Sequence, residues 1–176
     1  MKKLLFTFIA FSLMTGASCQ KKADIKKEKE AIKAVIEEER SAFFDRDFSR
    51  YEATWIQEST SRKYYMGESG INKIIGWSEV GKSDKEQIEN EELWENSKNL
   101  NAEYTNFEIS VYENTALVFH DTQWSGIFRG EELNTFQVRI LHLVKVEGKW
   151  KIDLMAMYSI PDEGDTDDND KDDDHE

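Results

Sequence analysis

The last third of the chain has the pattern of consecutive long strands, and this pattern limits the fold more than any other part of the sequence. Apolar and polar residues alternate through "AEYTNFEISVYE", "TALVFHDTQWSGIF", "LNTFQVRILHLVKV" and "KWKIDLMAMYSI". Turn residues separate them at Glu113–Asn114, Arg129–Glu132 and Glu147–Gly148. Strands of about ten residues run roughly 33 Å, and sheets that long twist and curl. We therefore expect an antiparallel meander with a concave face that other elements must cover.

Two amphipathic helices precede the meander. The first is expected to begin at Asp24, a plausible N-cap, and to run to Phe44; the second lies in "DFSRYEATWI", where Ser49 and Glu52 have the spacing of a capping box. Apolar residues recur at helical spacing in both, at Ile25, Ile32, Val35, Ile36 and Phe43 and then at Phe48, Tyr51 and Trp55. These faces are suited to cover the concave side of the sheet.

The middle of the chain is more polar. "STSRKYYMG" alternates and predicts a strand that ends at Gly67. Residues 72–80 are expected to form one or two helical turns, and Ser83 with Glu86 predicts the start of a polar helix that runs to about Ser97. We expect this segment to form an exposed lid or flank.

The N-terminus has the layout of a secretory signal. Lys2 and Lys3 are followed by an apolar run, by small residues and then by Cys19, the only cysteine. We expect residues 1–18 to be a signal peptide, 19–23 a lipidated cysteine with a tether, 24–161 a folded domain, and 162–176 a disordered acidic tail. That tail holds ten acidic residues and one lysine.

The cysteine position resembles the lipobox of bacterial lipoproteins, in which acylation anchors the new N-terminus to a membrane. Gly16 stands where leucine is usual, and the alternative is an ordinary signal peptide with a free thiol. The resemblance implies a lipid-anchored protein of the bacterial cell envelope. Gln20 after the cysteine favours the outer membrane. A formal net charge of -13 argues against nucleic acid as a partner.

The order of elements resembles the nuclear transport factor 2-like superfamily, in its SnoaL-like bacterial branch. The resemblance lies in residues 24–56, in Gly76–Trp77 and in "LHLVKVEGKWKIDLMAMYS". It implies an α+β cone in which the N-terminal helices pack in the concave face of a curved, mostly antiparallel sheet. It also implies a pocket at the open end of the cone and, frequently, a homodimer through the outer sheet face. The superfamily includes isomerases, polyketide cyclases, dehydratases and proteins that only bind or assemble, so it implies no single activity.

A cone of this kind would draw its pocket walls from the end of the second helix, the first strand and inward positions of the meander. The candidates for ligand binding are Trp55, Tyr64, Tyr65, Trp77, His120, Trp124, His142 and Tyr158. The alternative is that these side chains fill a core. The leading hypothesis is a membrane-anchored module that binds a small apolar or aromatic ligand or serves in assembly. The other is an isomerase, cyclase or dehydratase, for which no catalytic residue is assigned.

The charged strand residues leave further alternatives. His120 and His142, set among apolar neighbours, could serve as neutral bases or be buried and bonded to the backbone. They lack a third ligand at metal-site spacing, so no metal site and no cofactor are predicted. Arg139 could point into the cone and bind a carboxylate, but we expect it on the outer face with Lys145, paired across strands with aspartates.

Overall fold

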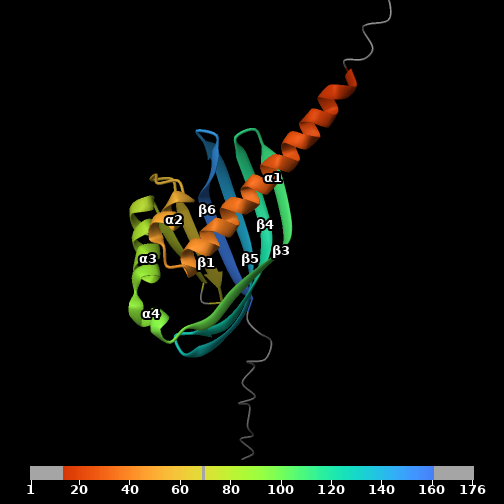
Figure 1. Cartoon of the computed structure of the whole chain (residues 1–176). Coiled ribbons are helices and arrows are strands. Elements are labelled where there is room, and N and C mark those ends of the chain that lie inside the picture. Colours follow the sequence, from red (N-terminus) through yellow and green to blue (C-terminus); the bar gives the residue numbers. More distant parts are fainter. Residues whose placement is uncertain (1–13, 69, 161–176) are drawn as a thin grey trace, which may run out of the picture.

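A computed structural model describes residues 14–68 and 70–160 of the chain (Figure 1). The helices are α1 (Met14–Phe44), α2 (Phe48–Ala53), α3 (Trp77–Glu89) and α4 (Glu91–Glu95). The strands are β1 (Arg62–Gly67), β2 (Gly70–Ile75), β3 (Lys98–Tyr112), β4 (Thr115–Phe128), β5 (Glu131–Val146) and β6 (Lys149–Ile160). Most of the expected signal peptide and the acidic tail lie outside the described residues. Within the described ranges, no helix combines the length and the apolar character that crossing a bilayer requires.

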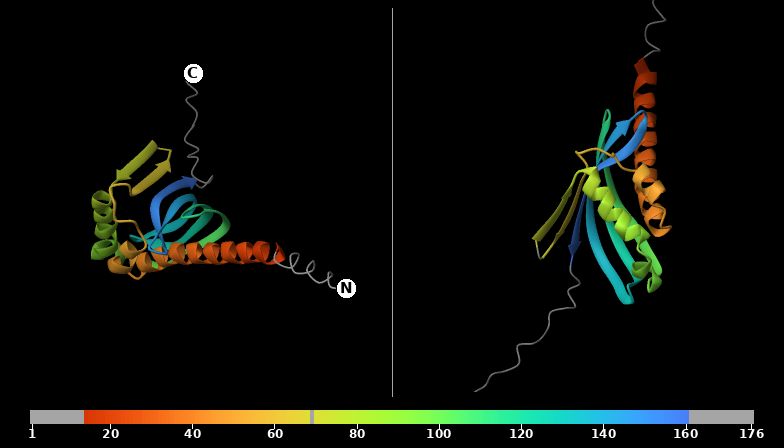
Figure 2. Two further views of the ribbon diagram at one scale, coloured as in Figure 1. Left: turned by 90° about the horizontal axis from the view of Figure 1, so that it is seen from above. Right: turned by 90° about the vertical axis from the view of Figure 1, so that its left-hand side faces the viewer.

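The six strands form one curved sheet in the order β2-β1-β6-β5-β4-β3. The pairs from β3 to β6 are antiparallel, which confirms the predicted meander, and β1 joins β6 in parallel. Helix α1 lies across the concave face, and its N-terminal part extends beyond the sheet (Figures 1 and 2). The expected α+β architecture, with N-terminal helices in the hollow of a curled sheet, is confirmed.

The curl is produced by irregularities in β3 and β4. The register of β3 against β4 shifts between Lys98 and Asn101 and again between Thr105 and Glu108, and bulges of this kind bend a strand. At the first shift, the backbone of Gly126 (φ 126°) approaches β3 so closely that an added Cβ would lie 2.6 Å from the carbonyl oxygen of Asn99. Only glycine fits both the dihedral and the space.

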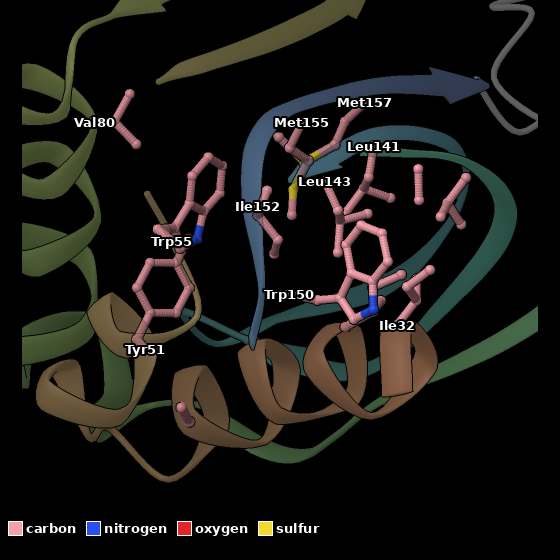
Figure 3. Close-up of a cluster of buried hydrophobic side chains, with 14 of the residues drawn as sticks. Ile32, Tyr51, Trp55, Val80, Leu141, Leu143, Trp150, Ile152, Met155 and Met157 are labelled. Carbon is pink, nitrogen blue, oxygen red and sulfur yellow. The ribbon is translucent and has the colours of Figure 1, made fainter. Parts of the chain in front are cut away.

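The core lies between α1 and the inner face of the sheet, where Ile32 packs with Leu141, Leu143 and Ile152 (Figure 3). Each of these four side chains is fully buried. Burying one such side chain contributes about 1.5–3 kcal/mol. This contact explains why the apolar face of α1 holds the helix in the hollow.

Polar contacts attach the N-terminal half of α1 to the end of the sheet where β5 turns into β6. Glu28 accepts hydrogen bonds from Lys145 Nζ at 2.6 Å and from Trp150 Nε1 at 2.7 Å. The expected outer position of Lys145 is therefore wrong. Odd-numbered residues of β5 face the helix, since Leu141 and Leu143 are buried there, and Lys145 follows the same alternation.

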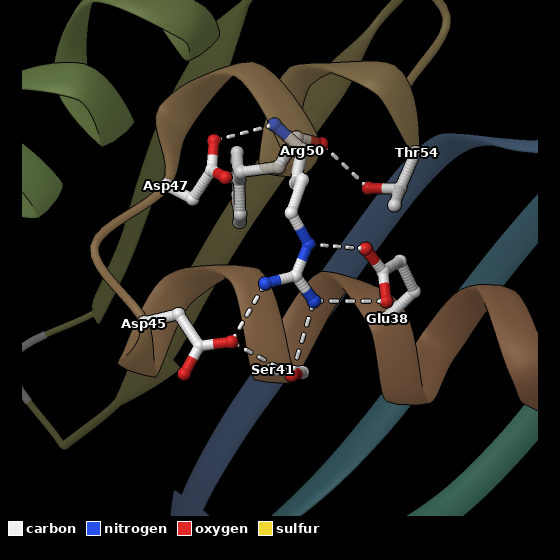
Figure 4. A network of polar contacts seen from close by, with 7 residues as sticks. Glu38, Ser41, Asp45, Asp47, Arg50 and Thr54 are labelled. Carbon is white, nitrogen blue, oxygen red and sulfur yellow. Dashed lines mark hydrogen bonds and ion pairs between the residues drawn. The ribbon is translucent and has the colours of Figure 1, made fainter.

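A network around Arg50 sets the angle between α1 and α2 (Figure 4). The Arg50 guanidinium donates to Glu38 at 2.8 Å and to Asp45 at 2.6 Å, both near the end of α1. Its backbone N–H donates to Asp47 Oδ1 at 3.0 Å, so Asp47 is the N-cap of α2. The expected capping box at Ser49 is wrong, because the helix begins one residue before it.

Three other local expectations are also corrected. Helix α1 begins at Met14, ten residues before the expected cap at Asp24. Helical turns were expected over residues 72–80, but residues 72–75 belong to strand β2, which pairs with β1, and only residues 77–80 are helical, as the start of α3. Short apolar runs do not distinguish a strand from a helix, and β1 supplies the partner. Ser83 lies inside α3 and caps nothing. The N-cap of α4 is Asn90, whose side chain accepts a hydrogen bond from the backbone N–H of Leu93 at 3.4 Å.

Candidate functional site

A cavity of about 370 Å³ lies between the C-terminal half of α1 and the inner face of the sheet. Its apolar wall consists of Phe43, Phe44, Leu100, Trp124, Phe128, Leu133, Met155 and Met157. Its polar wall consists of Glu39, Arg40, Lys63, Tyr65, Gln87, Tyr104, Thr135, Gln137, Arg139 and Ser159. A concave space that combines apolar side chains with polar groups that can orient a ligand is the usual form of a small-molecule site.

One side of the cavity carries a buried ion pair. Lys63 Nζ lies 2.7 Å from Asp84 Oδ1 and 3.1 Å from the Tyr51 hydroxyl, which itself donates to Asp84 Oδ2 at 2.8 Å. Burial alone would lower the pKa of Lys63, but the Asp84 carboxylate outweighs it and raises the pKa above its ordinary value. Lys63 therefore stays charged, and its charge is neutralised by Asp84, which does not itself line the cavity.

Glu39 is the acidic group of the cavity wall. It lies on α1 and is 5% exposed. Burial raises its pKa above the ordinary value, although the nearby positive charges of Arg139 and Lys63 oppose the shift. A carboxyl group in such surroundings is easier to protonate than one in water, which suits it to exchange a proton with a bound ligand.

Arg139 lies on the inner face of β5, where it is 5% exposed and lines the cavity. The preferred expectation of an outer position for Arg139 is wrong. Like Lys145, Arg139 is an odd-numbered residue of β5, and the odd-numbered residues of this strand face the helix. The aspartates do lie in polar pairs, but with other partners: Asp153 contacts His142, and Asp121 accepts from Asn106 at 2.7 Å. The alternative, an arginine that points into the cone, is the observed arrangement.

Two of the eight candidate ligand-binding residues, Tyr65 and Trp124, line the cavity. Trp55 and Trp77 lie in the core instead, with ring centroids 6.3 Å apart. Elements α2 and α3 pack together there, and this contact buries the Trp55 ring fully and the Trp77 ring partly.

Neither histidine lines the cavity. His120 is 1% exposed and lies behind the wall, with its ring 4.6 Å from that of Tyr104 and 4.9 Å from that of Phe107. Burial lowers the pKa of His120 to about 4, and its Nδ1 lies 3.1 Å from the Asp121 carbonyl oxygen. His142 lies on the outer face, where its Nδ1 is 3.1 Å from Asp153 Oδ2.

The last two candidates also lie on the outer face. Tyr64 alternates with Lys63 and Tyr65, which both line the cavity, so its side chain points the other way. Tyr158 is 45% exposed, between the cavity-lining Met157 and Ser159. Ligand binding by any of the eight residues stays a prediction.

Sequence reasoning missed Glu39 as a cavity residue, although a signal was present. Ile32, Ile36, Glu39 and Phe43 recur at intervals of four and three residues, so a carboxyl group lies on the apolar stripe of a predicted helix. A charge on such a stripe is costly unless it has a partner or a task. Tyr104 and Gln137 had no comparable signal, because their direction depends on the register of β3 and β5.

Among residues 14–68 and 70–160, no three potential metal ligands converge.

Comparisons of sequence identify no relatives: no family model matches the chain, and no curated protein matches it. Solved structures do match. A candidate dehydratase of the NTF2-like family from Streptomyces avermitilis aligns with a TM-score of 0.63 at 14% identity, over 78% of this chain and 99% of that one. An NTF2-like superfamily protein from Salmonella enterica serovar Typhimurium also gives 0.63 at 14% identity, over 81% and 98%.

A third match is an enzyme. The hexachlorocyclohexane dehydrochlorinase of Novosphingobium barchaimii aligns with a TM-score of 0.61 at 16% identity, over 81% of this chain and 95% of that chain. Identities this low establish the fold and not the activity. Together with the curled sheet and the helix in its hollow, these matches show that the chain has the cone-shaped fold of NTF2-like proteins.

Proposed function

We propose that the protein binds a small, largely apolar or aromatic molecule in the cavity of its cone. The observation that carries the proposal is the cavity itself, whose volume of about 370 Å³ falls in the range of small-molecule sites. Phe43, Phe44, Trp124 and Phe128 supply aromatic surface on facing sides of it. The SnoaL-like resemblance and the structural match to a dehydrochlorinase that acts on hexachlorocyclohexane support a small organic ligand.

Native mass spectrometry of the purified chain tests this proposal. We expect a co-purified adduct, or binding of an added aromatic compound, that is lost when Leu133→Trp fills the cavity. The matched control is Ile127→Trp, because Ile127 is an exposed residue of β4 that does not line the cavity. Equal binding by both variants would place the ligand elsewhere and contradict the proposal.

A second candidate function is catalysis with Glu39 as a general acid or base. The observation that favours it is a carboxyl group in the cavity wall whose pKa is raised by burial. Glu39→Gln would then abolish conversion of the bound ligand without weakening its binding. Unchanged conversion in Glu39→Gln would exclude this role.

We also propose that acylated Cys19 holds the protein on the cell-envelope membrane, with the outer membrane favoured. Support comes from the apolar run, the small residues and the position of the cysteine. The mass of the mature protein would show cleavage before Cys19 and added acyl chains, and Cys19→Ser would move the protein to the soluble fraction. A Cys19→Ser protein that stays with the membrane would contradict the anchor.

We also propose a homodimer through the outer face of the sheet, as the family resemblance implies. Phe119, Phe136 and Tyr158 leave between 36% and 45% of their surface exposed on that face, which supports an apolar contact. Native mass spectrometry reads out the subunit count directly. A monomer at all protein concentrations would contradict the dimer.

A further inference from the structure

We infer that the ligand of this cavity carries a carboxylate group that binds Arg139. The inference rests on the proposed function and specifies its ligand class: a small aromatic or otherwise apolar carboxylic acid. It depends on the partners of the guanidinium, on the remaining charges of the wall and on a second donor beside the arginine.

The Arg139 guanidinium lies over the Trp124 ring, 5.2 Å from its centroid, and its hydrogen-bond partners are weak and uncharged. Its Nε and Nη2 each lie 3.4 Å from Gln137 Oε1, its Nη1 lies 3.4 Å from the Tyr104 hydroxyl, and the Met155 sulfur is 4.0 Å away. Gln137 Oε1 already accepts a shorter bond of 2.9 Å from Trp124 Nε1. Among residues 14–68 and 70–160, no carboxylate oxygen lies within 4.0 Å of Arg139. A buried guanidinium is costly in this state, and a carboxylate is the partner that matches its donors.

The other charges of the wall do not neutralise Arg139. Lys63 and Asp84 satisfy each other at 2.7 Å. Glu39 forms no ion pair with Arg139 within 4.0 Å, and the two groups interact only over a longer distance. Arg40 adds a further cation, with its guanidinium 4.6 Å from the centre of the Tyr104 ring. In a protein whose formal net charge is -13, the cavity is therefore a local site of positive charge.

Tyr104 supplies a second donor at the same place. Its hydroxyl oxygen accepts from Arg139 Nη1 at 3.4 Å, so its own proton is available for donation to a ligand in the cavity that Tyr104 lines. Burial raises the pKa of Tyr104 to about 12, which keeps that proton in place at neutral pH. A carboxylate in the cavity could accept two bonds from Arg139 and one from Tyr104, while its apolar part contacts Phe43, Phe44 and Phe128.

Calorimetric titration of the full-length chain with 2-naphthoate and 2-naphthamide tests this inference. The two probes have nearly the same shape and differ in charge. We expect the wild-type protein to bind 2-naphthoate at least about tenfold more tightly than 2-naphthamide. Arg139→Gln should remove that preference and leave the affinity for 2-naphthamide within about twofold. The matched control is Arg129→Gln, because Arg129 is exposed and does not line the cavity.

The possible outcomes separate this inference from the proposed function. Equal affinity of the wild-type protein for both probes would overturn the carboxylate inference and leave ligand binding in place. Binding of neither probe would overturn both. A parallel loss of both probes in Arg139→Gln, with cooperative unfolding retained, would also overturn the inference, because Arg139 would then only support the cavity wall. Arg139→Lys should keep part of the preference, since it retains the charge without the planar fork.

Discussion

Lys63 on β1 and Asp84 on α3 form a buried ion pair with 2.7 Å between Nζ and Oδ1, and this pair joins the sheet to the helix that flanks it. The exposed fractions of the two side chains are 7% and 1%. Removing one partner leaves a buried charge with no compensation. We therefore expect Lys63→Met to lower the free energy of unfolding by about 3–5 kcal/mol, measured by urea denaturation.

The double variant Lys63→Met, Asp84→Leu serves as its control. Because it removes both charges, it should recover most of the lost stability. A double variant as unstable as Lys63→Met would show that packing, and not the ion pair, dominates at this position.

Arg139 should behave in the opposite way. Since its guanidinium is buried with weak, neutral partners, Arg139→Met should leave the melting temperature of the empty protein unchanged or raise it. Differential scanning calorimetry measures this directly. A loss of stability as large as that of Lys63→Met would mean that Arg139 is part of the fold and is not held for a ligand.

Glu39 should show its environment in the pH dependence of stability. Its folded-state pKa is raised above the ordinary value of 4.5, so the folded protein favours the protonated carboxyl group. The stability that it contributes is present below pH 4.5 and is lost as the pH rises through the folded-state pKa. Relative to Glu39→Gln, the wild-type protein should therefore lose stability as the pH rises above 4.5. A difference between the two proteins that does not vary with pH would contradict the raised pKa.

Glu39→Gln should also bind carboxylates better. Ionised Glu39 would repel an anion in the same cavity, and the amide removes that repulsion without a change in size. We expect tighter binding of 2-naphthoate by this variant and little change for 2-naphthamide, measured by the same calorimetric titration. Weaker binding of 2-naphthoate would indicate that Glu39 contacts the ligand through a protonated carboxyl group that the amide cannot replace.

His120 should make the fold sensitive to acid. Its pKa is lowered to about 4 from 6.5, so its contribution to stability is present above pH 6.5 and is lost as the pH falls through about 4. The shift corresponds to roughly 3 kcal/mol. The imidazole signals of His120 in a nuclear magnetic resonance titration should stay those of the neutral ring at pH 5.5. A His120 midpoint near 6.5 would contradict the burial.

The sequence predicted the larger elements because their signals repeat. Four strands with glycine or asparagine turns, and a long helix with an apolar stripe, constrain the chain strongly enough to indicate a curled sheet around a helix. The order of those elements was sufficient to identify the cone, although the identities with its structural matches are only 14–16%.

The site was less predictable because it depends on which way each strand residue faces. Apolar residues occupy both faces of β5, so alternation by itself did not show whether Arg139 or Ile140 points inward. Leu141 and Leu143 settle the question only once their burial is known. In the same way, His142 and Tyr158 have the chemistry of a site but lie on the outer face. Strand β2 was not predicted, because its structure depends more on its pairing with β1 than on its own residues.

Helix α1 runs without interruption from Met14 to Phe44 and so includes both Cys19 and Glu39. At about 1.5 Å per residue, these two positions are roughly 30 Å apart along one stiff rod. If Cys19 is acylated, as proposed, the helix would hold the cavity at a distance from the membrane surface. Helix α1 would then act as a spacer as well as an attachment.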